Sequence, residues 1–152
     1  MTDQIWFEDF ESGAVLTSPE RLITVADIDR WAALTGENHP VHMDEDFARA
    51  AGFLGRICHG LFSLALVEGL KAQIGVFDRS VTASLSWTDV RFLAPLYPGE
   101  RVRLRLELVS KRATRTPGRG LATERGTLLK ADGTEVVTGE HVVFLLNRPD
   151  RA

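Results

Sequence analysis

The spacing of apolar and polar residues changes along the chain, and its first half has the period of helices. Apolar residues recur every three to four positions between Thr24, a residue type that caps helix N-termini, and Gly36, which can end a helix. A second, short helix is predicted from Asp44 to Gly52. Residues 61–70 are apolar on nearly all sides, which is typical of a helix that the rest of the protein surrounds. The buried face of the short helix is predicted to consist of Phe47, Ala50 and Ala51.

The second half of the chain has the period of strands. Residues 101–108 alternate strictly between polar and apolar, which predicts a strand with one buried face and one face in water. Residues 84–88 also alternate, and the shift in phase that follows predicts a bulge near Asp89. Two further strands, residues 121–130 and 135–146, are predicted to form a hairpin, because residues 132–133 between them are the turn pair Asp-Gly.

This order of elements is typical of the α+β class. Strands with one apolar face need a cover, and the apolar helix can supply it. We therefore expect a curved antiparallel sheet wrapped around a long central helix, in a single domain over residues 1–152. Exposed edge strands commonly pair with another copy of the chain, so we also expect a homodimer or a higher homo-oligomer.

Composition and charge narrow the class of protein. Hydrophobic residues make up 44% and charged residues 26% of the chain, as in ordinary globular proteins. The net charge of −3 predicts neither a nucleic-acid nor a membrane partner. The longest apolar stretch is too short to span a bilayer, and the first residues lack the pattern of a signal peptide. The single cysteine, Cys58, excludes an intramolecular disulfide, so we expect a cytoplasmic protein.

One short segment, residues 35–44, concentrates the residue types of acid–base catalysis. It carries the carboxylate of Glu37 and the imidazoles of His39 and His42. A glycine and a proline within the segment restrict its backbone, so we expect a shaped loop that holds these side chains in fixed geometry. A metal site formed by His39, His42 and Asp44 is an alternative that this spacing leaves open.

Three sequence blocks resemble the MaoC-like dehydratases, also called (R)-specific enoyl-CoA hydratases, a family with the hotdog fold. The blocks are ALTGENHPVHMD at residues 33–44, GFLGRICHGL at residues 52–61 and RFLAPLYPGE at residues 91–100. Each block alone is a weak signal. Their order and spacing together are specific, and the resemblance covers most of the chain.

The resemblance implies a role for each candidate residue. Glu37 and His42 would form the catalytic pair, while His39 would be structural. The backbone N–H of Gly60 would bind the thioester oxygen at the start of the apolar helix. The substrate site would further include His59, Phe62 and Ser63. The resemblance implies no metal and no cofactor, since coenzyme A enters as part of the substrate.

The activity implied is a hydro-lyase reaction, the reversible addition of water to a trans-2-enoyl-CoA, with an (R)-3-hydroxyacyl-CoA as the product. Glu37 stands where the family usually has an aspartate, which is shorter by one methylene. A non-catalytic acyl-CoA-binding subunit is therefore one alternative function, and an acyl-CoA thioesterase of the same fold is another.

A basic segment, Lys111–Gly120, also has two interpretations. It holds four basic residues and a Pro-Gly pair. It is expected to be a solvated hairpin loop, although its charge would also suit the phosphates of coenzyme A.

Overall fold

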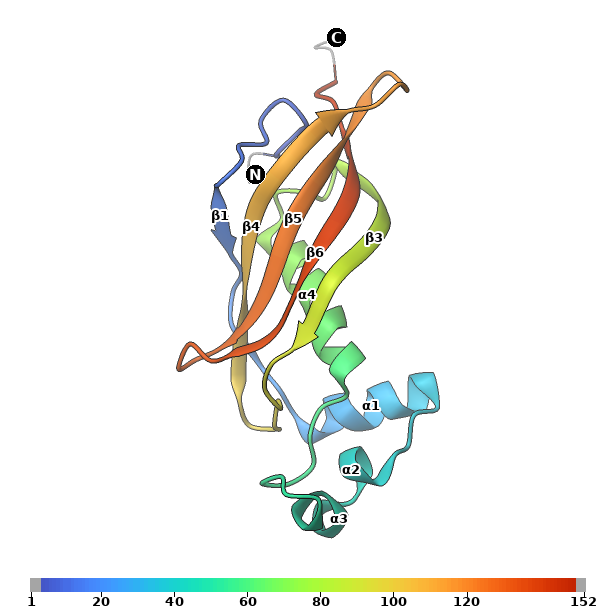
Figure 1. Cartoon of the computed structure of the whole chain (residues 1–152), viewed down its shortest axis with the longest axis vertical. Coiled ribbons are helices and arrows are strands. Elements are labelled where there is room, and N and C mark those ends of the chain that lie inside the picture. The colour runs from blue at the N-terminus through green and yellow to red at the C-terminus, as the bar shows by residue number, and fades with distance from the viewer. Residues whose placement is uncertain (1–3, 150–152) are drawn as a thin grey trace.

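A curved antiparallel sheet wraps around one long helix in the computed structural model, which describes residues 4–149 (Figure 1). The strand order across the sheet is β1-β4-β5-β6-β3, and the short β2 pairs with β4. The predicted α+β class is confirmed. The strands are β1 (Val15–Thr17), β2 (Arg21–Leu22), β3 (Val81–Phe92), β4 (Arg101–Ala113), β5 (Arg119–Lys130) and β6 (Glu135–Leu146), and the helices are α1 (Val25–Thr35), α2 (Pro40–Met43), α3 (Glu45–Ala50) and α4 (Gly60–Ile74).

Helix α1 begins and ends where the sequence predicts. The hydroxyl of Thr24 accepts a hydrogen bond from the backbone N–H of Asp27, and the Asp27 carboxylate accepts one from the backbone N–H of Thr24. This reciprocal capping box satisfies N–H groups that the helix itself leaves free. Gly36 ends the helix with a φ of +80°, a conformation that glycine adopts without strain.

Helix α2 lies inside the segment that was expected to be a loop without helix. Pro40 occupies its first turn, where the missing N–H carries no penalty, and the side chain of His39 accepts a hydrogen bond from the backbone N–H of Val41. A proline that restricts a loop can equally start a helical turn, so the expectation of a loop was only partly right.

Helix α3 starts as predicted, because the Asp44 carboxylate accepts a hydrogen bond from the backbone N–H of Phe47 at 2.9 Å. The helix ends at Ala50, and its buried residue is Ala48. The predicted buried face of Phe47, Ala50 and Ala51 is wrong, because all three side chains are exposed. A six-residue helix at the edge of the molecule buries only the narrow face that it turns toward its neighbours.

Helix α4 covers the concave side of the sheet with one face. Phe62, Leu66, Val67 and Leu70 are buried in the core, whereas Leu61 is 60% exposed. The helix approaches β5 so closely that a Cβ atom on Gly126 would lie 2.5 Å from a methyl carbon of Val67. Within this chain, the helix is therefore covered on one side and open on the other, although its sequence is apolar almost all round.

The strands confirm the main predictions for the second half of the chain. Val102, Leu104, Leu106 and Leu108 alternate as buried positions along β4. The register between β3 and β6 shifts between Thr88 and Arg91, and the intervening Asp89 has a φ of +50°, which confirms the bulge. The hairpin of β5 and β6 turns at Gly133, whose φ is +90°. Strand β3 lies at one edge of the sheet and is exposed along most of its length.

A network of ionisable side chains fills the space between α4 and the sheet. Lys71 of α4 pairs with Glu124 of β5, and both side chains are almost fully buried. Nδ1 of His141 lies 3.2 Å from Glu124 and 3.0 Å from Glu68, while its Nε2 lies 2.6 Å from the Ser84 hydroxyl. The carboxylates of the network therefore lie against its basic groups, in a place where an isolated charge would be strongly unfavourable.

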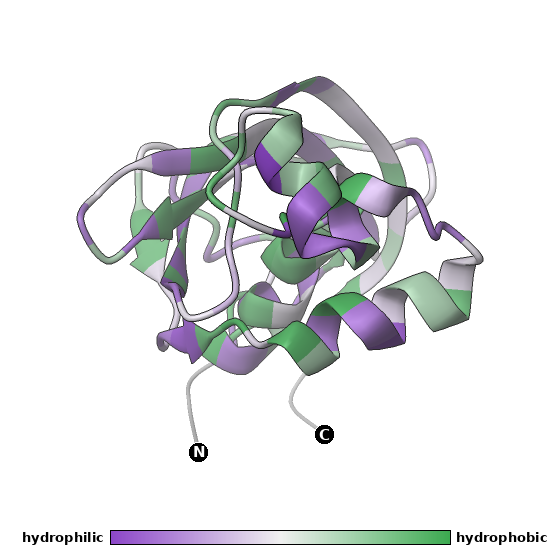
Figure 2. Cartoon of the chain, turned by 90° about the horizontal axis from the view of Figure 1, so that it is seen from below, coloured by the Kyte–Doolittle hydropathy of each residue, from purple (hydrophilic) through white to green (hydrophobic). Residues whose placement is uncertain are grey.

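The three short helices close one end of the molecule. Figure 2 looks onto that end and shows that α1 carries hydrophilic and hydrophobic residues in turn along its length. Ile28 and Ala32 make its buried face. Since α1, α2 and the start of α4 meet at this end, the segments that carry Glu37, His42 and His59 come together there.

Candidate active site

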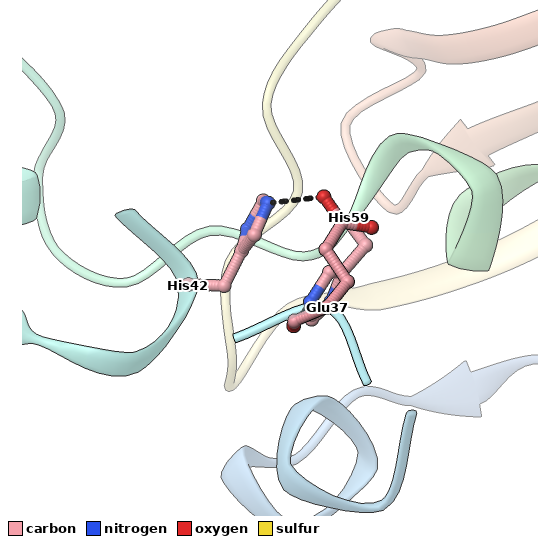
Figure 3. Close-up of side chains that lie close together, drawn as sticks. All are labelled: Glu37, His42 and His59. Carbon is pink, nitrogen blue, oxygen red and sulfur yellow. Dashed lines mark hydrogen bonds and ion pairs between the residues drawn. The ribbon is translucent and has the colours of Figure 1, made fainter. Parts of the chain in front are cut away.

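Three side chains from separate elements meet at the helical end of the molecule (Figure 3). Glu37 follows the end of α1, His42 lies on α2, and His59 immediately precedes α4. Oε1 of Glu37 lies 3.7 Å from Nε2 of His42. This distance is longer than a direct hydrogen bond, so the two acceptor atoms face each other without being bonded directly.

The tautomer of His42 follows from its second contact. Nδ1 of His42 lies 2.8 Å from the carbonyl oxygen of Ile57, which can only accept, so Nδ1 carries a proton and donates it. In the neutral ring, Nε2 is therefore an unprotonated base that faces Glu37. Burial and the neighbouring His59 lower the pKa of His42 below its ordinary 6.5, and the Ile57 carbonyl and Glu37 only partly oppose this shift. The ring is thus held in the form that can accept a proton at neutral pH.

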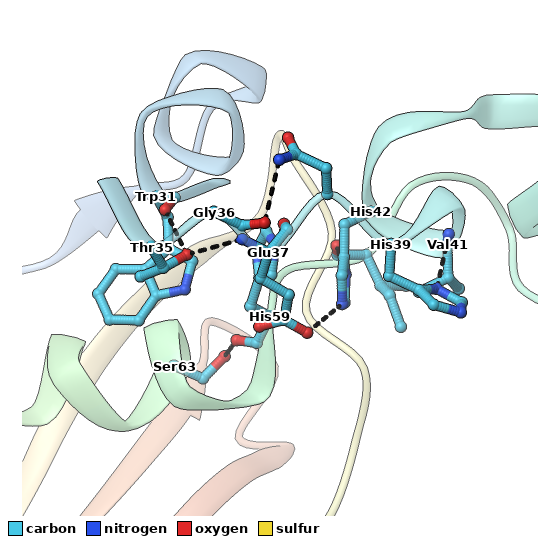
Figure 4. A network of polar contacts seen from close by, with 11 residues as sticks. Trp31, Thr35, Gly36, Glu37, His39, Val41, His42, His59 and Ser63 are labelled. Atoms are coloured by element: carbon cyan, nitrogen blue, oxygen red, sulfur yellow. Dashed lines mark hydrogen bonds and ion pairs between the residues drawn. The ribbon is translucent and has the colours of Figure 1, made fainter. Parts of the chain in front are cut away.

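Glu37 has a fixed backbone and a side chain that solvent can reach (Figure 4). Its N–H donates to the hydroxyl of Thr35 at 3.3 Å, and the Asn38 side chain donates to the carbonyl oxygen of Gly36 at 3.1 Å. The Thr35 hydroxyl in turn donates to the carbonyl oxygen of Trp31. The Glu37 side chain is 50% exposed, so the carboxylate lies at the surface of the site.

His59 lies beneath the pair and is only 1% exposed. Its ring stacks on the ring of His42 with centroids 3.8 Å apart and 28° between the planes. Its Nε2 lies 2.9 Å from the carbonyl oxygen of Glu37. His59 therefore contacts both members of the pair, one through its ring face and the other through its backbone.

A pocket of about 360 Å³ opens beside His42. Its walls are almost entirely apolar, and no charged side chain of the described residues lines it. Gly60 and Ser63 contribute one wall, since residues three apart share a face of the helix. The remaining lining residues are Phe53, Ile57, Cys58, Phe92, Leu93, Ala94, Pro95, Leu96 and Val136.

Most of the predicted substrate-site residues lie at the pocket in the structure, and one lies elsewhere. Gly60 and Ser63 line the pocket, and His59 lies behind it. Phe62 does not line the pocket, because it points into the core and packs against Trp31 with ring centroids 5.5 Å apart. The assignment of Phe62 to the substrate site is therefore corrected, since a helix turns neighbouring residues about 100° apart.

Gly60 has a second feature that fits a close approach to substrate. A Cβ atom at this position would lie 3.1 Å from the ring of Phe92, so a larger residue would crowd the pocket wall. Its N–H belongs to the first turn of α4, where N–H groups have no partner within the helix. Three lining residues were given no role from the sequence. Phe92 and Leu96 belong to the third sequence block, which was used only to identify the resemblance, and Val136 lies on a strand without a local signal of a site.

The metal alternative for His39, His42 and Asp44 is not supported by the structure. Within residues 4–149, the described groups close enough to share an ion are Glu37–His42–His59 and Glu68–Glu124–His141, and neither includes His39 or Asp44. The spacing of His39, His42 and Asp44 along the sequence therefore does not correspond to a cluster of ligand atoms in the fold.

The basic segment lies far from the pocket. Lys111 belongs to β4 and donates to the carbonyl oxygens of Phe7 and Glu8, while the guanidinium of Arg119 packs on the ring of Phe144. The turn between β4 and β5 lies at the opposite end of the sheet from α1–α3 (Figure 1). This segment therefore does not line the pocket of its own chain.

Comparison with known proteins identifies the family. A model described as "MaoC like domain" matches residues 9–127, which is more than half of the chain. The chain belongs to the MaoC-like dehydratase family. It is 36% identical over 101 residues to Protein MaoC of Klebsiella aerogenes, and this alignment covers 66% of this chain but only 30% of that protein. It is also 28% identical over 140 residues to the (R)-specific enoyl-CoA hydratase of Rhodospirillum rubrum, which covers 92% of this chain and 91% of the relative.

Solved structures confirm the hotdog fold of this MaoC-like chain. A conserved hypothetical protein of Mycobacterium tuberculosis, described as having a double hotdog fold, aligns with a TM-score of 0.82 at 23% identity. The alignment covers 98% of this chain and 46% of that protein. Among the described residues, no helix has the length and apolar character needed to cross a membrane.

Proposed function

We propose that the chain is an enoyl-thioester hydratase, which adds water reversibly to a trans-2-enoyl-CoA. The observation that carries the proposal is the gap of 3.7 Å between Oε1 of Glu37 and Nε2 of His42, at the mouth of an apolar pocket. A carboxylate and an unprotonated imidazole nitrogen that face each other can both accept hydrogen bonds from one water molecule. The family and the hydratase relatives support this assignment.

In the proposed reaction, the water oxygen bonds to Cβ of the substrate while His42 Nε2 takes one of the water protons. The Glu37 carboxylate accepts the other O–H of the water and so orients its lone pair. The electron pair of the double bond moves toward the thioester carbonyl. Cα then receives the proton that His42 took from the water. Dehydration follows the same steps in reverse.

The developing charge on the thioester oxygen needs a hydrogen-bond donor, and the N–H of Gly60 is the candidate. It lies in the first turn of α4, whose dipole favours negative charge at that end. Removal of one such donor typically slows an enzyme by a factor of about 100 to 1000. Gly60 also lines the pocket beside Ser63, so donor and acyl group would share one wall.

The apolar pocket supports an uncharged acyl group. A second carboxylate on the acyl chain would be buried without a basic partner, because no Lys or Arg is among the lining residues. We therefore expect crotonyl-CoA and longer unbranched enoyl-CoA substrates to react faster than enoyl-CoA substrates with a terminal carboxylate.

A second copy of the chain is the proposed partner. Strand β3 is an exposed edge of the sheet, and Leu61 and Ala65 of α4 are uncovered in the single chain. An open edge and an adjacent apolar helix face together favour pairing across a two-fold axis. Sedimentation of the purified protein tests this expectation.

The decisive experiment for the proposed activity follows the loss of enoyl absorbance when purified protein is mixed with crotonyl-CoA, hexenoyl-CoA or octenoyl-CoA. His42→Ala and Glu37→Gln should each reduce kcat by at least about 100-fold, as expected for groups that transfer or orient a proton. His39→Asn is the matched control, because asparagine can replace histidine as the cap of α2 and leaves both Glu37 and His42 in the site. Failure of every enoyl-CoA to react would refute the hydratase function.

The second candidate is a non-catalytic acyl-CoA-binding subunit, which the glutamate at position 37 favours if the family's aspartate is required. It predicts saturable acyl-CoA binding without loss of the enoyl band. A thioesterase would instead release free coenzyme A thiol, which a thiol reagent detects, so one set of reactions separates the three functions.

A further inference from the structure

We infer that His59 is the positioning residue that holds both members of the catalytic pair and does not itself contact substrate. The inference rests on the proposed function, since it assigns His59 a part in the same site. Its basis is that one buried ring contacts the backbone of Glu37 and the side chain of His42 at the same time.

The contact with Glu37 sets the tautomer of His59. The carbonyl oxygen of Glu37 can only accept, so Nε2 of His59 carries the proton and donates it at 2.9 Å. This bond joins the residue before α4 to the loop after α1, across 22 positions of sequence. Because this bond holds the backbone of Glu37, it fixes the point from which the half-exposed side chain extends toward His42.

The contact with His42 is made through the ring face. With centroids 3.8 Å apart, the His59 ring lies against the imidazole of His42 and limits its rotation. The edge of the His42 ring is fixed by its hydrogen bond to the carbonyl oxygen of Ile57. Stacking and hydrogen bond together leave Nε2 of His42 directed at Glu37, which is the geometry that proton transfer requires.

Two observations argue against a merely structural role for His59 as a helix cap. First, His59 occupies the N-cap position of α4, but its side chain makes no capping hydrogen bond. Second, its Nδ1 is buried and has no hydrogen-bond partner among residues 4–149. A buried unpartnered nitrogen is unfavourable, and an apolar ring would avoid it. The imidazole is explained by the two contacts that it does make.

The stacked ring also bears on the charge of His42. Burial is the largest cause of the lowered pKa of His42, and the His59 ring covers one face of that imidazole. His59 therefore helps to keep the proposed base unprotonated as well as in place.

Two variants separate the two contacts. His59→Gln can keep a side-chain N–H for the carbonyl oxygen of Glu37 but removes the stacked ring. His59→Phe keeps a ring against His42 but removes the N–H. We expect each variant to lower kcat by roughly 10- to 100-fold, because displacement of reacting groups by about 1 Å has effects of this size. KM should stay within about threefold of the wild-type value, because His59 is absent from the pocket wall.

The pH profile provides a second readout, because the His59 ring covers one face of the His42 imidazole. His59→Gln removes that ring and lets water reach His42, so it should raise the pKa of His42 and shift the acid limb of kcat/KM to higher pH, whereas His59→Phe keeps a ring there and should leave the limb in place. The inference is overturned if both variants keep wild-type kcat. It is also overturned if only one variant is impaired, since one side chain would then not hold both partners.

A measurement on the wild-type protein covers the case in which the variants do not fold. Long-range ¹⁵N–¹H NMR spectra of labelled protein distinguish the two tautomers of each neutral histidine. We expect the Nε2–H form for His59 and the Nδ1–H form for His42. A His59 found in the Nδ1–H form would overturn the inference directly, because it could not donate to Glu37.

The tautomer measurement needs no turnover, so the two proposals can fail separately. An inactive protein with the expected tautomers contradicts the hydratase function and leaves the positioning geometry intact. An active protein whose His59 variants retain full kcat contradicts only the role of His59.

Discussion

Replacement of Glu37 by aspartate measures how closely this site is fitted to the longer carboxylate. Aspartate keeps the charge and shortens the side chain by one carbon–carbon bond, which is about 1.5 Å. If the backbone stays in place, the gap between carboxylate and His42 Nε2 widens from 3.7 Å to about 5 Å. The backbone has reason to stay, because Glu37 is held through its N–H by Thr35 and through its carbonyl by His59.

The expected loss follows from this displacement. Misplacement of a reacting group by about 1 Å can slow a reaction on the order of 100-fold, which corresponds to roughly 2.7 kcal/mol of transition-state stabilisation. We therefore expect Glu37→Asp to lower kcat by about 30- to 100-fold with little change in KM. The Glu37→Gln variant keeps the length and removes the charge, so it serves as the comparison that separates position from charge.

The assay is initial-rate hydration of crotonyl-CoA over a range of concentrations, with unfolding temperatures to confirm that all variants are folded. Activity in Glu37→Asp equal to or above that of the wild type would refute the reasoning. It would mean that the carboxylate works from a position other than the one seen here. An inactive wild type made active by aspartate would instead favour the acyl-CoA-binding function.

Three further predictions concern pH and packing. Burial and neighbouring imidazoles lower the pKa of His42, and the base must be unprotonated to act, so the midpoint of the acid limb of kcat/KM should lie below pH 6.5. A midpoint at or above pH 7 would contradict this assignment. Burial alone would lower the pKa of His141, but hydrogen bonds to Glu124 and Glu68 raise it above 6.5, although Lys71 opposes them. The contribution of protonated His141 to the stability of the fold is therefore complete below pH 6.5 and is lost as the pH rises through the raised pKa. Urea unfolding at pH 6 and pH 8.5 should show this loss in the wild type and not in His141→Gln, and equal pH dependence of the two would be evidence against it. Gly126→Ala should destabilise the protein by about 1–3 kcal/mol, because the new methyl group would overlap Val67. In the control Gly69→Ala, where nothing lies within 4 Å, the free energy of unfolding should stay equal or rise by up to about 1 kcal/mol, and a similar loss in both variants would contradict the overlap.

The predictions from sequence that held depend on local chemistry. The start of α1 at Thr24 and its end at Gly36 are set by residues that lie close together in the chain. The alternation along β4 and the turn at Gly133 are local in the same way. Such signals can be read from the sequence alone, because the partner of each residue lies a few positions away.

The features that were missed depend on contacts across the fold. The sequence alone shows that residues 61–70 are apolar all round, but not that this chain covers only one side of the helix. Phe62 and Ser63 are neighbours in sequence, yet one faces the core and the other faces the pocket. The stacking of His59 on His42 likewise joins residues 17 positions apart, and nothing in their spacing predicts it.

The separation of the two ends of the sheet has a practical consequence. From the pair Val102–Lys130 to the pair Ala113–Gly120, strands β4 and β5 extend for some 11 residues, or roughly 36 Å. The exposed tip of this hairpin, residues 115–118, thus lies far from the pocket of its own chain. Exposed loop tips tolerate insertions well. A short peptide tag placed there would attach the protein to a solid support with the pocket directed toward the solution, and would turn the chain into an immobilised reagent.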